Sequence, residues 1–143
     1  MKQNSKLSLA LHTLGHMAVK PEQPMTSDFI GEFHQTNPVV VRRVLGLLRE
    51  AGLLISEKGH AGGWRLARPA DQISVAEVYL ALGEPYLKPA GKGPDTPPGC
   101  AIRTAMEETV NLAVTEAEAV FVERLRTKTL ADLAATMGPA LHG

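Results

Sequence analysis

The stretch that most restricts the possible folds of this chain runs from Thr26 to Gly52. Thr26 or Ser27 can cap a short helix, SDFIGEFHQ, because a side-chain oxygen at that position accepts a backbone N–H. Asn37 is an N-cap of the same kind, and Pro38 suits the first position of a second helix that Gly52 ends. Two helices joined by a tight polar turn predict a helix-turn-helix.

A β-hairpin is predicted directly after these two helices. Residues 53–57 and 64–67 are strand-like runs, and the sequence KGHAGG between them permits the positive backbone angles of a close turn. A hairpin in this place is a wing. We therefore expect a mainly α-helical fold with a small β-hairpin wing, namely a winged helix-turn-helix.

Helical periodicity continues on both sides of this unit. Leu7, Leu11 and Leu14 recur at three- and four-residue steps, which predicts an amphipathic helix over about 5–19. Ser74 can cap a further helix in ISVAEVYLALGE. The following stretch is rich in proline and glycine, which is typical of a loop or lid.

From Cys100 onward the apolar residues again recur at helical spacing. They are Ile102, Met106, Val110, Leu112, Val120, Phe121, Leu125, Leu130 and Leu133. So long a helix cannot bury its apolar stripe against a small domain, so we expect it to pack against its twin in a homodimer. The predicted division is a winged helix-turn-helix over 1–70, a linking helix and loop over 71–99, and a dimerisation helix with a C-terminal tail over 100–143.

Charge is balanced over the whole chain, with 15 basic and 15 acidic residues, but it is uneven along it. Residues 1–68 carry nine basic and five acidic residues, a net +4, and the remainder carries −4. Such asymmetry is typical of a nucleic-acid-binding half joined to a half with another task. No apolar run approaches the roughly 20 residues that cross a bilayer, and no P-loop, HExxH or GxSxG motif is present. We expect a cytoplasmic protein that is neither membrane-bound nor an enzyme.

Five segments together resemble the Rrf (Rrf-two) family of winged-helix transcription regulators, which are IscR-, NsrR- and CymR-like. The segments are Ser5-Lys6, TNPVVVRRVLGLLREAGLL, the wing KGHAGGWRLAR, ISVAEVYLAL and TLADL. The TNPVV sequence is similar to the cluster-free, YwnA-like branch of that family. The resemblance implies a homodimer that binds double-stranded DNA.

The expected DNA contacts lie at the starts of the predicted helices and at the wing tip. They are Lys6, Thr26, Ser27, Asn37, Val39, Val40, Arg42, Arg43, Lys58 and His60. An arginine fork can bind guanine or phosphate bidentately, and free N–H groups at a helix start favour phosphate. A solvated helix face or an ordinary hairpin tip would also explain Arg42, Arg43 and Lys58, but the helix-turn-helix context favours DNA. Trp64 is expected to pack beneath the wing.

The means of sensing is less constrained by the sequence. Cluster-binding relatives use three cysteines after the fourth helix, whereas Cys100 is alone here, so we expect no iron–sulfur cluster and no other cofactor or metal. Cys100 is either an inert thiol or a redox sensor, since thiols at helix starts are often reactive. His12 and His16 can chelate a metal from one helix face, but two partly buried polar residues are the favoured interpretation.

The leading function is therefore a DNA-binding transcriptional regulator, in its simplest form a repressor, that binds an inverted-repeat operator as a homodimer. One alternative is a protein-interaction regulator that docks a metabolic enzyme. Another is a thiol- or metal-responsive sensor variant of the same fold. A small-molecule or protein effector can be accommodated, but no residue pattern identifies one.

Overall fold

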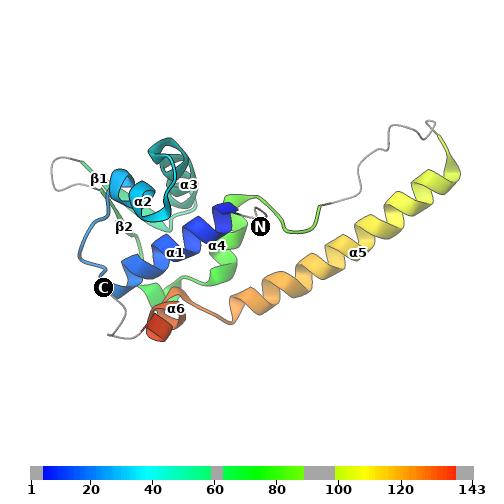
Figure 1. Cartoon of the computed structure of the whole chain (residues 1–143). Coiled ribbons are helices and arrows are strands. Elements are labelled where there is room, and N and C mark those ends of the chain that lie inside the picture. Colours follow the sequence, from blue (N-terminus) through cyan, green and yellow to red (C-terminus); the bar gives the residue numbers. More distant parts are fainter. Residues whose placement is uncertain (1–4, 59–62, 89–98, 138–143) are drawn as a thin grey trace.

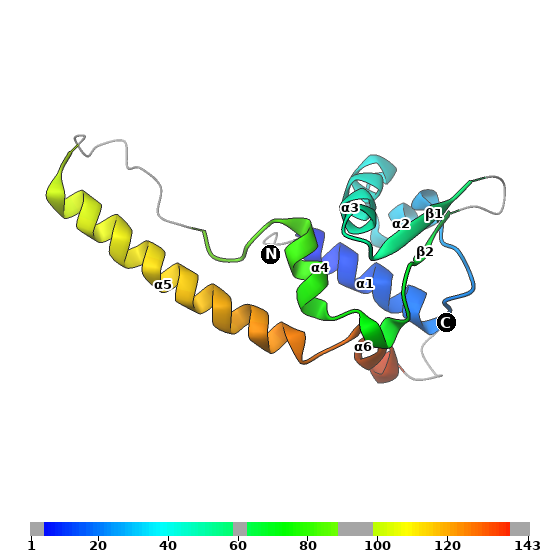
Figure 2. The same cartoon turned by 180° about the vertical axis from the view of Figure 1, so that it is seen from behind.

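The computed structural model describes residues 5–58, 63–88 and 99–137, so His60 of the predicted wing tip lies outside it. The elements are α1 (Ser5–Val19), α2 (Ser27–His34), α3 (Pro38–Glu50), β1 (Leu54–Glu57), β2 (Gly63–Leu66), a 3₁₀ turn (Ala70–Gln72), α4 (Val75–Leu82), α5 (Ala101–Arg126) and α6 (Leu130–Met137). Figures 1 and 2 show α1 to α4, the hairpin and α6 gathered in one body, from which α5 extends. The predicted fold class is confirmed.

The helix-turn-helix is built by local capping signals. The hydroxyl oxygen of Thr26 accepts a hydrogen bond from the backbone three residues later at 3.1 Å, so Thr26 and not Ser27 caps α2. The amide oxygen of Asn37 accepts one from the N–H of Val39 at 2.7 Å, and Pro38 begins α3 as predicted. These bonds satisfy N–H groups that the first turn of a helix leaves unpaired.

The turn between α2 and α3 depends on a close backbone approach at Gly31. Gln35 adopts a left-handed conformation with φ of 54°, and the N–H of Thr36 then donates to the carbonyl oxygen of Gly31 at 2.8 Å. A Cβ atom on Gly31 would lie only 2.8 Å from the carbonyl oxygen of Thr36. Any larger residue must therefore push the turn away from α2.

We expect Gly31→Ala to lower the free energy of unfolding by about 1–3 kcal/mol, as overpacking against rigid backbone does. Gly46→Ala in α3 is the matched control, because a Cβ there meets nothing within 4 Å. That change should raise stability by up to about 1 kcal/mol, since alanine is the better helix former. Urea unfolding of both variants measures the difference, and equal stabilities would contradict the described turn.

One face of α3 forms the centre of the core. Val41, Val44, Leu45 and Leu48 follow helical spacing and are completely buried. They belong to the same cluster of buried side chains as Leu14 of α1. Because this face is buried against α1, the opposite side of α3 is exposed to solvent.

The prediction of uninterrupted helix after Cys100 is wrong, because the helix breaks over 127–129. The hydroxyl of Thr129 accepts the N–H of Asp132 at 3.1 Å, and the carboxylate of Asp132 accepts the N–H of Thr129 at 2.9 Å. These two reciprocal bonds make a capping box, which starts α6 as a separate helix.

Backbone pairing then returns α6 to the core. The N–H of Val75 donates to the carbonyl of Lys128 at 2.8 Å, and the N–H of Leu130 donates to Ile73 at 2.9 Å. Leu130 is fully buried, and α6 packs against α1. The C-terminal segment thus completes the core of the helix-turn-helix body.

The C-terminal half of α5 is held against α4 by an aromatic cluster. The hydroxyl of Tyr79 donates to the carboxylate of Glu118 at 2.9 Å and accepts from the N–H of Tyr86 at 3.0 Å. The ring of Phe121 lies 5.0 Å from that of Tyr79 and 5.4 Å from that of Tyr86. These contacts fix the direction in which α5 leaves the body.

Another side of α5 is an exposed apolar stripe. The exposed fractions are 80% for Ile102, 54% for Met106, 40% for Val110 and 65% for Val120. The first three are spaced by four residues, and Val120 follows Ile102 by about five helical turns, so all four share one side. None of the described helices is both long and apolar enough to cross a membrane.

Candidate nucleic-acid interface

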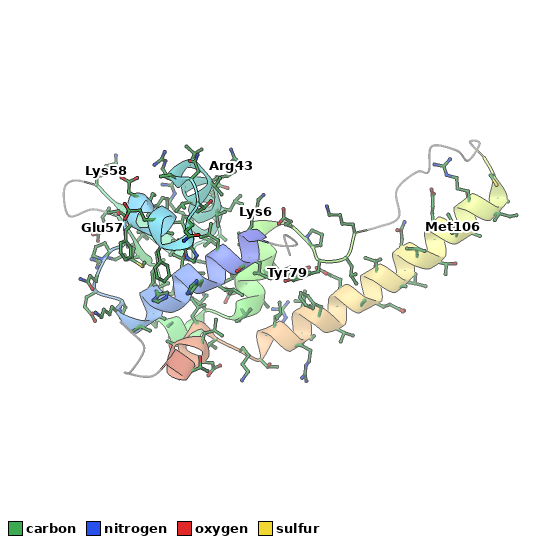
Figure 3. The ribbon with its side chains drawn as sticks, in the orientation of Figure 1. Lys6, Arg43, Glu57, Lys58, Tyr79 and Met106 are labelled. Atoms are coloured by element: carbon green, nitrogen blue, oxygen red, sulfur yellow. The ribbon has the colours of Figure 1, made fainter. Side chains whose placement is uncertain are left out.

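The outer side of α3 presents three of the predicted DNA contacts. Val39 is 51% exposed, and Arg42 and Arg43 are exposed beside it, whereas Val40 is half-buried against the core. Figure 3 shows Arg43 on the side of α3 that faces away from α1. Neither arginine takes part in an ion pair within the described ranges, so both guanidinium groups can bind an external anion.

Three polar residues at the starts of α2 and α3 are placed by the caps. Thr26 and Asn37 are exposed, and their side-chain oxygens hold the two helix starts. Ser27 is half-buried, and its hydroxyl oxygen accepts a hydrogen bond from the indole Nε1 of Trp64 at 2.9 Å. Ser27 therefore connects α2 to the wing, a role that its position in the sequence does not indicate.

The wing is a two-stranded antiparallel hairpin. Ile55 pairs with Arg65 and Glu57 with Gly63, and the carboxylate of Glu57 lies 3.1 Å from Nε of Arg65. Lys58 is exposed where β1 ends, and Figure 3 shows it on the same side of the molecule as Arg43. Basic groups from α3 and the wing thus share one side.

Lys6 is placed differently from the other predicted contacts. Its ammonium nitrogen lies 3.7 Å from the carboxylate of Glu84, which follows α4. Both side chains are about one third exposed, at 36% and 37%. This partner offsets part of the charge that Lys6 would bring to a phosphate.

An open depression of about 540 Å³ lies over the turn between α2 and α3. Asp28, Glu32 and Asn37 are among the residues that line it. Two carboxylates make it a poor place for a phosphate, because like charges repel. The phosphate-binding part of the surface is therefore expected on the arginine side of α3.

Three histidines cluster between α1 and α2. The ring of His12 lies 4.9 Å from that of His16 and 4.7 Å from that of His34, and Phe33 packs edge-on against the ring of His16. Nε2 of His34 is 3.2 Å from the hydroxyl of the buried Thr13. Reasoning from the sequence paired His12 with His16 but missed His34, which only the packing of α2 on α1 brings close.

The pKa of His34 is lowered from its usual value, first by burial and then by the proximity of His12 and His16. The unfolded chain therefore binds a proton at a higher pH than the folded chain does. The free energy of unfolding is highest above about pH 6.5, where His34 is neutral in both states, and it falls as the pH is lowered and the unfolded chain takes up the proton first. The lowered pKa values of Glu77 and Asp132 belong to carboxyl groups, which titrate at more acidic pH.

We expect the urea midpoint of unfolding to fall as the pH is lowered from 7.5 to 5.5. His34→Gln keeps an amide that can bond to Thr13 but cannot titrate, so its midpoint should depend less on pH over this range. Midpoints at three pH values for both proteins measure the effect. Parallel pH curves for the two proteins would show that His34 is not the source.

The sequence of this chain is similar to those of known transcriptional regulators. The sequence model of the Rrf2 family, described as iron-dependent transcriptional regulator, matches residues 3–136. YwnA of Bacillus subtilis (strain 168), named as an HTH-type transcriptional regulator, is 37% identical over 109 residues, which are 74% of this chain and 80% of YwnA. The protein slr0846 of a Synechocystis strain, with the same kind of name, is 30% identical over 135 residues, 93% of this chain and 87% of that protein.

Solved structures show the same architecture. CymR, the global cysteine regulator of B. subtilis, superposes with a TM-score of 0.62 at 26% identity, over 95% of this chain and 98% of CymR. IscR of T. potens superposes with a TM-score of 0.66 at 22% identity, over 100% of this chain and 93% of IscR. At that identity the second likeness concerns the fold alone.

The Rrf2 family is described as iron-dependent, and an iron centre would need suitable donor side chains in this chain. Cys100, the only cysteine, is half-buried at the N-cap of α5. The part of the chain that the structure describes has no group of three or more His, Cys, Asp or Glu side chains that could hold a metal ion. An iron–sulfur cluster takes four ligands, commonly thiolates. The donor set therefore does not fit such a cluster.

Proposed function

This chain belongs to the Rrf2 family of transcriptional regulators, and from that premise we propose that it binds double-stranded DNA as a homodimer. The family and the relatives are regulators, and the chain is not an enzyme. We infer DNA binding from the different burial of the two sides of α3. Its Val41 side is buried in the core, while the side bearing Arg42 and Arg43 is exposed without ion pairs in the described ranges.

In the proposed complex the start of α3 enters the major groove. Arg42 and Arg43 bind base edges or phosphates, and Val39 meets the methyl group of a thymine. Asn37 and Thr26 cap the starts of α3 and α2 and so hold both helices in the orientation in which they meet DNA. Lys58 extends from the wing toward the neighbouring minor groove, and His60, outside the described residues, is proposed to accompany it.

The proposed dimer forms along α5. At 26 residues α5 is about 39 Å long, and its exposed stripe of Ile102, Met106, Val110 and Val120 would lose its contact with water against a second copy. A two-fold axis between two such helices relates the two DNA-binding surfaces by a half-turn. The two halves of an inverted-repeat operator are related in the same way.

A dimer bound across a promoter would most simply act as a repressor in the cytoplasm, where the DNA is. Because its donor set does not fit an iron–sulfur cluster, we propose that its signal reaches it in another way. A small-molecule or protein effector is one route. Modification of Cys100, which is half-buried at the start of α5, is the other.

Capture of genomic fragments by the purified protein, with and without a thiol oxidant, tests this function. We expect a small set of fragments that share an inverted repeat. If Cys100 senses oxidation, the oxidant should change their recovery for the wild type but not for Cys100→Ser. Recovery no better than that of an Arg42→Ala, Arg43→Ala double variant would refute DNA binding by this surface.

A further inference from the structure

We propose that Trp64 is a positioning residue that fixes the wing relative to the recognition helix, so that the two reach DNA as one rigid surface. The inference rests on the proposed DNA-binding function and extends it to a residue that does not touch DNA. Trp64 is only 9% exposed and lies in β2 opposite Ser56. What distinguishes it is the number of separate elements that its side chain and backbone connect.

The backbone of Trp64 ties the wing to the segment before α2. Its N–H donates to the carbonyl of Met25 at 2.8 Å, and the N–H of Met25 donates back to the carbonyl of Trp64 at 3.0 Å. Strand β2 is therefore held on both edges, by β1 on one side and by Met25 on the other. A hairpin bonded along one edge only could tilt more freely.

The indole ring of Trp64 joins both helices of the helix-turn-helix to the wing. Its Nε1 donates to the hydroxyl of Ser27, the first residue of α2, at 2.9 Å. The guanidinium carbon of Arg49, in the last turn of α3, lies 5.7 Å from the ring centroid, within the range of a cation–π contact. Arg49 also donates to the hydroxyl of Ser56 in β1 at 3.3 Å.

The residue before Trp64 shows how tightly this joint is packed. Gly63 has a φ of 151°, and a Cβ atom on it would lie 2.7 Å from the carbonyl oxygen of Met25. At Gly63 the backbone of β2 thus lies directly against the backbone of Met25, with no room for a side chain between them. Lys58 lies one residue beyond Glu57, which pairs with Gly63, so the joint sets the place from which Lys58 extends.

A wing held in place before binding avoids the entropy cost of ordering it in the complex. Loosening the joint should therefore remove the contribution of Lys58 to DNA binding while leaving the arginines of α3 in place. Trp64→Phe keeps a ring in the core and removes the N–H donor, and Ser27→Ala removes the acceptor. Each should weaken DNA binding by about three- to tenfold and by no more than Lys58→Ala does, because the lost bond lies within the protein and acts on DNA only through the placement of Lys58. The variant that carries both Trp64→Phe and Ser27→Ala should lose no more DNA affinity than either single variant, because both changes remove the same hydrogen bond.

The decisive experiment is a double-mutant cycle with Lys58→Ala, read by anisotropy of a labelled genomic fragment that the wild-type protein enriches. Lys58→Ala should weaken binding severalfold in the wild type but less than twofold in Trp64→Phe and in Ser27→Ala. Thr129→Val is the matched control, because it removes a hydroxyl that accepts the N–H of Asp132 at 3.1 Å at the start of α6, away from the wing. In that background Lys58→Ala should have its full effect.

Each other result has a definite meaning. If Lys58→Ala is equally harmful in all backgrounds, Trp64 only stabilises the fold and the inference is overturned. The same holds if Lys58→Ala has no effect although the change of Arg42 and Arg43 abolishes binding, since the wing then has nothing to position. If none of these changes affects DNA binding, the proposed function itself fails.

Discussion

Replacing Arg42 and Arg43 together by alanine is expected to weaken operator binding by at least about 100-fold. Each arginine contact to a base or phosphate contributes about 1–3 kcal/mol, and a dimer would lose four of them. Both side chains are exposed on α3, so the fold should be retained. Titration of labelled operator at several salt concentrations measures the affinity, and the salt dependence should also become less steep because fewer phosphates are neutralised.

The matched control for this variant is Lys20→Ala with Lys128→Ala. It removes the same charge from exposed positions outside α3, the wing and α5. If the two double variants lose affinity equally, overall charge and not the surface of α3 governs binding.

Glutamate at Met106 and Val110 is expected to convert the protein to a monomer. Both side chains belong to the exposed stripe of α5, at 54% and 40% exposure. In the proposed dimer four carboxylates would then be buried close together, which is strongly unfavourable. Light scattering after size exclusion should give a monomer at micromolar concentration, and the affinity for a two-half-site operator should fall by at least about 100-fold because the half-sites are no longer bound together.

Thr115→Glu is the control on the same helix, at an exposed position away from the stripe. It should leave the dimer intact. A dimer that survives the change at Met106 and Val110 would contradict pairing along this side of α5.

The features that could be predicted from the sequence are those that local chemistry decides. The N-cap at Asn37, the proline after it and the buried spacing of Val41, Val44 and Leu48 place α3 and its exposed side. The proposed DNA surface depends on these few residues. The exposed position of Arg42 and Arg43 on α3 could therefore be predicted without any tertiary contact.

The features that were missed depend on contacts between distant residues. Ser27 meets Trp64 across 37 positions, and His34 meets Thr13 across 21, so no local pattern reports either pair. The end of α5 is an intermediate case. The capping box of Thr129 and Asp132 is local, but the apolar spacing continues through it and hides the break.

The most direct test of the central claim is footprinting of the purified protein on a DNA fragment that it enriches. Two symmetric recognition surfaces predict two protected half-sites in inverted orientation, with centres separated by about one or more turns of about 10 base pairs. A single unrepeated footprint, or no protection at low ionic strength, would contradict a homodimer that reads DNA through α3 and the wing.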